Sequence, residues 1–338
     1  MTNRNNSIDI AKGSLILCVI LGHLLLGTIE GNPIRYVIYS FHMPVFMFIS
    51  GYMINIDKIS RMSFHDILTK YWNRMLKIWL IAYFIFSIYD VLHEPTIKHL
   101  CTLIYSPWYH LWYVPTLFCF ILICRFLSTI AKREIVLFYP ILLMTSMIYI
   151  TLSQICPISL PRWCDCNYLP YFTIGLLCGN QSPRCPYKPC VLLALSYLPF
   201  LLIARTTHTM LSDLLRIIYL LLIILFFIYP SIKRDSLPMS DTLEYIGKNS
   251  LNVYLWHMIP IVILKNCISN AIVYYGISFT LLVIYMVIVK IRLNKNYKLN
   301  HCHWCLDVNW SMLELTNFYL YCPGINYNCI NFGHGQYV

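Results

Sequence analysis

Charged residues are scarce in this sequence. Asp, Glu, Lys and Arg make up 12% of the 338 residues, whereas a soluble domain has about 25%. Hydrophobic residues reach 59%, and several apolar runs are long enough to cross a hydrocarbon core about 30 Å thick. This composition excludes an ordinary soluble domain. It predicts a polytopic membrane protein.

Acidic residues are the scarcer charged kind, with 14 Asp and Glu against 25 Lys and Arg. The expected spans hold almost none of these acids, since Asp90 and Asp213 fall near span ends. Proton-coupled carriers commonly use carboxylates inside the membrane. Their scarcity weighs against that class of transporter.

The apolar runs predict an all-α fold, a polytopic bundle of about ten transmembrane helices. An even number of spans places both termini on the same side of the membrane. The expected spans are 13–30, 34–54, 76–93, 110–130, 135–152, 168–180, 190–205, 212–230, 250–269 and 271–291.

The formal net charge of +11 needs no nucleic acid to explain it. Most Lys and Arg fall in loops on the side of the N-terminus, which predicts that both termini are cytoplasmic and that the chain lies in the cell inner (plasma) membrane. The lipid bilayer is therefore an expected partner. The loop Asp57–Lys77 concentrates basic residues and would attract a cytoplasmic anion.

Residues 7–52 form the most informative stretch, with two apolar spans joined by a short turn. Each span contains one histidine, His23 and His42. An ionisable side chain at membrane depth marks a functional site by default. Because both histidines lie at similar distances from the turn at Gly31, a helical hairpin would bring them into one layer.

Helical geometry places Asp9, Lys12, Ile16, Ile20 and His23 on one face of the first span. His23 lies eleven positions after Lys12, which is just over three full turns and roughly 16 Å along the axis. Asp9 precedes Lys12 by three residues, so the two can form an ion pair. The stripe leads from the membrane surface inward.

Two further segments carry candidate residues. In the segment Tyr105–Pro115, Trp112 and Tyr113 either belong to an interfacial aromatic belt or wall a carbohydrate-binding mouth. The ninth span carries a third intramembrane histidine, His257, with a lower rank as a catalytic candidate.

After about Asn294 the composition changes, and residues 293–338 are expected to be an atypical tail, disordered or unrelated to the rest. The Cys302–Cys305 pair has the CxxC form, but the neighbouring spacings match no compact zinc pattern, so no metal site is expected.

The segments IDIAKG, LGH, SFHMPVFMFISGY, YWNRMLKIWLIAY and NSLNVYLWH, in this order and spacing, resemble the acyltransferase 3 family of integral-membrane O-acyltransferases. The resemblance covers residues 5–292. It implies transfer of an acetyl group from cytoplasmic acetyl-CoA to a hydroxyl of a surface carbohydrate, free or lipid-linked, without a metal.

The resemblance also implies roles. Lys12 and His23 occupy the family's essential basic and histidine positions, and Arg74 with Lys77 matches a second basic motif. Many members have arginine where this chain has Lys12 and Lys77, and lysine lacks the bidentate fork of arginine.

These roles give the following expectations. His23, His42 and Asp9 are the catalytic candidates, with His23 as the base and His42 as orienting partner, second acid/base or transient acyl acceptor. Lys12, Arg74 and Lys77 would bind CoA phosphates, while Trp112, Tyr113 and His257 would contact the acceptor. The alternative is a transporter or flippase of a polysaccharide intermediate, in which the histidines relay protons.

Overall fold

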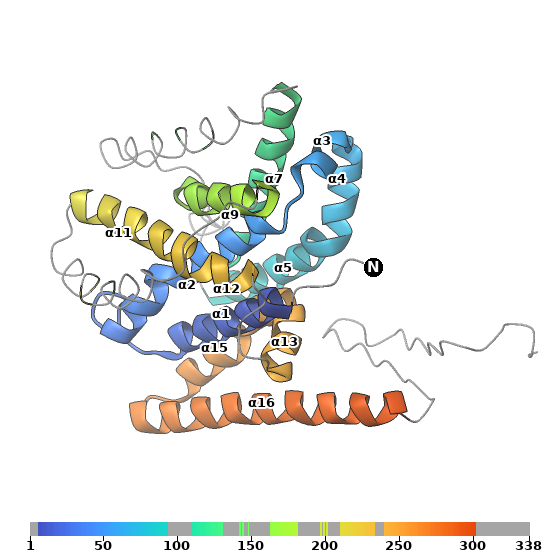
Figure 1. The fold of residues 1–338 in the computed structure, drawn as a ribbon. Coiled ribbons are helices and arrows are strands. Elements are labelled where there is room, and N and C mark those ends of the chain that lie inside the picture. Colours follow the sequence, from blue (N-terminus) through green and yellow to red (C-terminus); the bar gives the residue numbers. More distant parts are fainter. Residues whose placement is uncertain are drawn as a thin grey trace, which may run out of the picture. The chain divides into compact units, whose positions relative to one another are not determined.

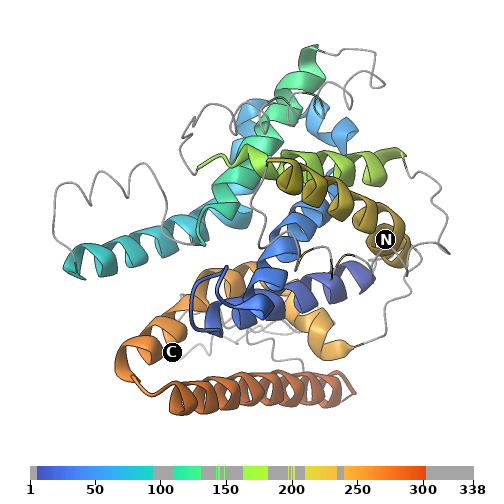
Figure 2. The same ribbon diagram turned by 90° about the vertical axis from the view of Figure 1, so that its left-hand side faces the viewer.

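The computed structural model describes residues 6–93, 110–130, 163–181, 210–233 and 240–301, together with positions 142, 144, 148, 197, 199 and 201. These residues form helices and short links, and no strand occurs among them (Figures 1 and 2). The longer helices are α1 Asn6–Leu24, α2 Pro33–Tyr52, α5 Lys77–His93, α7 Tyr113–Ile130, α9 Leu169–Gln181, α11 Met210–Ile223, α15 Met258–Cys267 and α16 Ala271–His301. The shorter elements are α3 Ile56–Arg61, α4 Phe64–Tyr71, η1 Trp72–Leu76, η2 Cys166–Tyr168, η3 Ile224–Ile228, α12 Tyr229–Lys233, α13 Asp241–Lys248 and α14 Ser250–Trp256.

Four helical segments are long and apolar enough to cross a membrane: Asn6–Leu24, Phe64–Leu92, Leu215–Lys233 and Ala271–Ile291. The expected count of about ten is not reached within the described ranges. Apart from isolated positions, the expected spans 135–152 and 190–205 lie outside them. The expected tail also lies mostly outside them, and helix α16 continues past residue 292 to His301.

The first two spans form the predicted hairpin, but the first helix ends at Leu24 instead of residue 30. Gly27 in the link has a φ of +90°, which glycine adopts without strain. Asn32 then caps α2, because its side chain accepts hydrogen bonds from the Ile34 and Arg35 amides. Pro33 follows at the first helical position, where its missing N–H is not needed.

The carbonyl groups at the end of α1 have partners from a distant part of the chain. Tyr274 donates its hydroxyl to the Leu24 carbonyl at 2.9 Å, and Lys265 Nζ donates to the His23 carbonyl at 2.9 Å. The final carbonyls of a helix have no intrahelical partner and need such donors. These bonds fix the end of α1 that carries His23.

One expected span is interrupted, and a π-helical turn precedes another. The segment 250–269 is interrupted at His257, between α14 and α15. Pro260 explains the interruption, because it has no N–H to bond the Trp256 carbonyl four residues earlier. A π-helical turn, η1, separates α4 from α5 and carries Arg74. Such turns occur frequently at functional sites.

Glycines permit two close helix pairs, α1 with α13 and α2 with α9 (Figure 1). A Cβ atom on Gly247 would lie 1.8 Å from the Asp9 carbonyl oxygen, and one on Gly13 would lie 2.1 Å from the Leu243 carbonyl oxygen. Small residues at membrane helix contacts allow backbones to approach in this way. The α1–α13 contact therefore fixes the surroundings of Asp9 and Lys12.

The chain divides into two compact units, Met1–Tyr275 and Gly276–Val338. The described part of the second unit is the remainder of α16, and its apolar side chains as far as Ile291 are largely exposed. All candidate residues from the sequence belong to the first unit.

Candidate active site

A cavity of about 380 Å³ lies among α1, α2, η1, α7 and the link between α13 and α14. Three cationic side chains line it: Lys12, Arg74 and Lys248. Asp9 is the only carboxylate among its described lining residues. Apolar side chains form much of the remaining wall, namely Ile16, Met43, Phe46, Met53, Met75, Ile78, Val114, Leu117 and Leu251. A cavity with a cationic side and an apolar side suits an anionic ligand that has an apolar arm.

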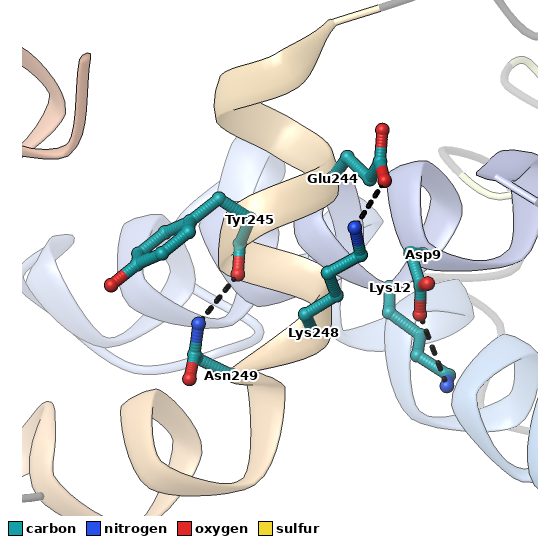
Figure 3. Close-up of polar contacts among 6 residues, drawn as sticks. All are labelled: Asp9, Lys12, Glu244, Tyr245, Lys248 and Asn249. Atoms are coloured by element: carbon teal, nitrogen blue, oxygen red, sulfur yellow. Dashed lines mark hydrogen bonds and ion pairs between the residues drawn. The ribbon is translucent and has the colours of Figure 1, made fainter. Parts of the chain in front are cut away.

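The predicted ion pair of the first helix is present in the structure. Lys12 Nζ lies 3.7 Å from Asp9 Oδ1, and the side chains are 15% and 3% exposed, respectively (Figure 3). A buried carboxylate is destabilising unless it has such a partner. Asp9 therefore balances the charge of Lys12 and lines the cavity, about four helical turns from His23.

The two basic residues expected after the hairpin have different surroundings. Both side chains are exposed, but Arg74 lines the cavity from η1, whereas Lys77 at the start of α5 is not a lining residue. Lys248 contributes the third cation instead, from a helix more than 170 positions further along the chain.

Ser50, Tyr113 and Tyr254 form another part of the cavity wall. Ser50 Oγ and Tyr113 Oη are 2.7 Å apart, and the rings of Tyr113 and Tyr254 have centroids 5.4 Å apart. Tyr254 also contacts the rings of His110 and His257, at 5.5 and 6.2 Å. Tyr254 thus links the cavity to a cluster of histidines that are not themselves lining residues.

The histidine cluster joins helices that are far apart in sequence. Ring centroids are 5.2 Å apart for His23 and His257, 5.1 Å for His110 and His257, and 6.4 Å for His23 and His110. His42 approaches through Tyr39, whose ring is 5.7 Å from His23 and 5.1 Å from His42. The expected layer of His23 and His42 is therefore present, with a tyrosine between the two rings.

Backbone carbonyls determine the tautomers of three of these histidines. His42 Nδ1 lies 2.6 Å from the Ile38 carbonyl, His257 Nδ1 2.7 Å from the Tyr254 carbonyl, and His110 Nε2 3.1 Å from the Leu255 carbonyl. A carbonyl oxygen only accepts, so each of these nitrogens carries a proton. In the neutral rings the other nitrogen, His42 Nε2, His257 Nε2 or His110 Nδ1, keeps its lone pair and can act as a base.

The second ring nitrogen of His257, Nε2, is buried. His257 is 8% exposed, and its Nε2 has no hydrogen-bond partner among the described residues. His23 differs, because its Nδ1 lies 3.1 Å from Tyr39 Oη and either atom can be the donor. Close imidazoles in a poorly solvated site repel each other when charged. The cluster therefore accommodates one proton more readily than two.

Trp112 and Tyr113 are adjacent in sequence, but they belong to different environments. Tyr113 lines the cavity, whereas Trp112 stacks on Tyr168 of η2, with centroids 4.7 Å apart and an interplanar angle of 27°. Of the expected acceptor-binding residues, Tyr113 thus shares a cavity with Lys12, and His257 is part of the histidine cluster.

Sequence reasoning did not single out three residues of this region, His110, Lys248 and Tyr254. His110 is 3% exposed and lies at the beginning of an expected span. The rule applied to His23, that ionisable groups at membrane depth mark a site, could have identified it. Lys248 and Tyr254 gave no comparable signal, because basic residues at span ends and tyrosines within spans are ordinary.

Comparison with known proteins gives a family and short similarities. A family model described as an acyltransferase domain, that of acyltransferase 3, matches residues 5–291. A nodulation protein NolL of Sinorhizobium fredii is 48% identical over 58 residues, and one of Mesorhizobium japonicum is 52% identical over 58 residues. Each match covers 15% of this chain and 16% of the relative. No solved structure matches the chain.

Proposed function

Since this chain belongs to the acyltransferase 3 family, we propose that it moves an acetyl group from acetyl-CoA to a hydroxyl of a cell-surface carbohydrate. One observation carries the proposal. Helix α1 contributes Lys12 to the cationic cavity and His23 to the histidine cluster. The same helix thus connects an anion-binding region with groups that can accept a proton.

In this proposal the donor binds in the cavity. Lys12 and Arg74 hold the CoA phosphates, and Lys77 contributes a weaker, solvent-exposed attraction. The apolar wall accommodates the pantetheine arm. With the phosphates at Lys12, the arm has to extend roughly 16 Å to place the thioester at the level of His23. Tyr113 and Tyr254 lie along that path, so their side chains have to admit the arm.

The chemical step needs a base and a stabilised oxyanion. His23 accepts the proton of the acceptor hydroxyl while the hydroxyl oxygen attacks the thioester carbonyl carbon. The tetrahedral intermediate then breaks its carbon–sulfur bond, and the CoA thiolate takes the proton from the imidazolium. The products are an ester and CoA, and no oxidant, reductant or metal is required.

The remaining residues assist this step. His42 Nε2 is a second proton acceptor, and Tyr39 connects it to His23. His257 and Tyr113 contact the acceptor or the acyl group, whereas Trp112 supports an acceptor-binding surface beside η2. Asp9 acts through Lys12 by balancing its charge.

The proposed orientation follows the distribution of basic residues. The cationic cavity opens toward the cytoplasm, where acetyl-CoA is found, and both termini lie on that side of the plasma membrane. The acceptor is an exopolysaccharide, a capsule or an O-antigen, free or lipid-linked. The pathway for the acetyl group then runs along α1, from Lys12 to His23.

The test is acetylation of surface polysaccharide in cells that carry the intact protein, H23A or no copy. Mild alkali releases ester-bound acetate, which proton NMR quantifies. We expect acetate only with the intact protein, with a loss of about 10²- to 10⁴-fold in H23A, the usual contribution of a general base. H65A is the matched control, because His65 is exposed on α4 and outside the cluster.

Equal acetate in all three strains would contradict the proposal. Transport of labelled polysaccharide intermediate into membrane vesicles would then test the flippase alternative. Membrane insertion of H23A is verified by its abundance in the membrane fraction.

A further inference from the structure

The third cation of the cavity, Lys248, has no role in the function proposed above. It ends α13, and its Nζ donates to Glu244 Oε1 one turn earlier on the same helix. Figure 3 shows this pair on α13 next to the Lys12–Asp9 pair on α1. Two ion pairs from separate helices therefore lie at one end of the cavity.

The relative position of these pairs is fixed by backbone contact. Gly247 directly precedes Lys248, and a Cβ atom there would lie 1.8 Å from the carbonyl oxygen of Asp9. Asp9 in turn pairs with Lys12. The α1–α13 contact thus holds Lys248 beside Lys12 without any movement of the helices.

The lining residues have an excess of positive charge. Three cations, Lys12, Arg74 and Lys248, face the cavity with one carboxylate, Asp9, which gives a net charge of +2 by subtraction. Asn249, Ser250 and Asn252 add neutral polar groups to the same wall. A site with this excess of positive charge suits a ligand that carries several phosphate charges.

The cations differ in depth. The Lys12 side chain is 15% exposed, whereas that of Lys248 is 40% exposed, so Lys248 is nearer to water than Lys12. Arg74, which lines the cavity from η1, is exposed as well. In CoA the diphosphate lies next to the pantetheine arm, and the 3′-phosphate lies farther away, on the ribose. If the arm points inward past Ile16, the diphosphate reaches Lys12 and the 3′-phosphate stays near the mouth.

We propose that Lys248 binds the 3′-phosphate of the CoA donor, exchanging the Glu244 carboxylate for a phosphomonoester, while Lys12 and Arg74 bind the diphosphate. This inference rests on the proposed use of acetyl-CoA. Glu244 holds the ammonium group in place when the site is empty, and the more highly charged phosphate displaces it. Lys248 is thereby a specificity residue that distinguishes CoA from its 3′-dephospho form.

The test measures binding of acetyl-CoA and of acetyl-3′-dephospho-CoA to the full-length protein in lipid nanodiscs. We expect the intact protein to bind acetyl-CoA about 10-fold more tightly, and K248Q to bind the two donors equally. The loss in K248Q is confined to acetyl-CoA, since the dephospho donor has no group for Lys248 to bind. K248R, which keeps the charge, restores most of the preference.

Two controls separate this role from a structural one. K58Q removes an exposed lysine on α3 that does not line the cavity, and we expect it to keep the full preference. E244Q removes the competing carboxylate, and we expect it to bind acetyl-CoA as tightly as the intact protein or more tightly. Thermal unfolding of each variant confirms that it is folded.

The outcomes distinguish the two proposals. If the intact protein binds neither donor, the proposed function fails and this inference fails with it. If the intact protein prefers acetyl-CoA and K248Q keeps that preference, only the inference is overturned. A loss of the preference in R74Q but not in K248Q would assign the 3′-phosphate to Arg74 and would also overturn it.

Discussion

The two ends of helix α1 have different physical environments. Around Lys12 the charges are paired with carboxylates and partly exposed, as in Lys12–Asp9 and Lys248–Glu244. Around His23 the imidazoles are close together, and three of the four donate to backbone carbonyls. The Lys12 end presents cations that are paired with carboxylates. The His23 end, where Lys265 bonds the backbone, presents imidazoles that can accept a proton.

This difference implies a division of labour. Permanent cations at a wet site contribute mainly to binding of an anion, and their removal weakens affinity. Neutral imidazoles with free lone pairs contribute to proton transfer, and their removal lowers the rate of the chemical step. Variants at the two ends should therefore separate into effects on donor affinity and effects on turnover.

The largest effect is expected at the close backbone contact between α1 and α13. G247A places a Cβ atom 1.8 Å from the Asp9 carbonyl oxygen, and neither backbone atom can move away without separating α1 from α13. We expect the free energy of unfolding to fall by about 1–3 kcal/mol, as for other overpacked sites. Donor affinity should fall as well, because Lys12 and Lys248 separate.

The control for this change is G276A. Gly276 also lies within a helix, α16, but a Cβ atom there has no heavy atom within 4 Å. Alanine is the better helix former, so G276A should be neutral or slightly stabilising. Thermal unfolding in detergent compares the two variants, and equal stability would show that α1 and α13 are not in close backbone contact.

A smaller effect, confined to turnover, is expected at His110. Its Nε2 donates to the Leu255 carbonyl at 3.1 Å, and its ring lies 5.1 Å from that of His257. H110Q keeps an N–H donor for the carbonyl but removes the second imidazole nitrogen, whereas H110F removes both. We expect turnover to fall about 10- to 100-fold in both variants, with unchanged acetyl-CoA affinity.

The comparison of these variants identifies the part of His110 that matters. If H110Q turns over as fast as the intact protein and H110F does not, the hydrogen bond to Leu255 is sufficient and the other imidazole nitrogen has no role. Steady-state rates at saturating donor, together with donor affinity measured directly, give both quantities.

The sequence predicted the parts of this site that one helix determines. The period of α1 placed Asp9, Lys12 and His23 on one face, and the Asp9–Lys12 pair is present. It could not predict His110, Lys248 or Tyr254 as neighbours of that face, because these contacts depend on the packing of distant helices. The interruption at His257 was not predicted, because hydropathy alone does not register the hydrogen bond that Pro260 cannot make, although this proline was a visible signal for it.

The smallest and most discriminating difference is expected between the two basic residues of one sequence motif. Both side chains are exposed, but Arg74 lines the cavity from η1 and Lys77, three residues later, lies outside it. We expect R74Q to weaken acetyl-CoA binding about 10-fold and K77Q to change it less than about 2-fold. Salt should reduce the small K77Q effect further, because an exposed charge outside the site is screened within about 8 Å at physiological ionic strength. Equal losses in both variants would mean that the two side chains face the donor together, which requires η1 to be an ordinary α-helical turn when the donor is bound.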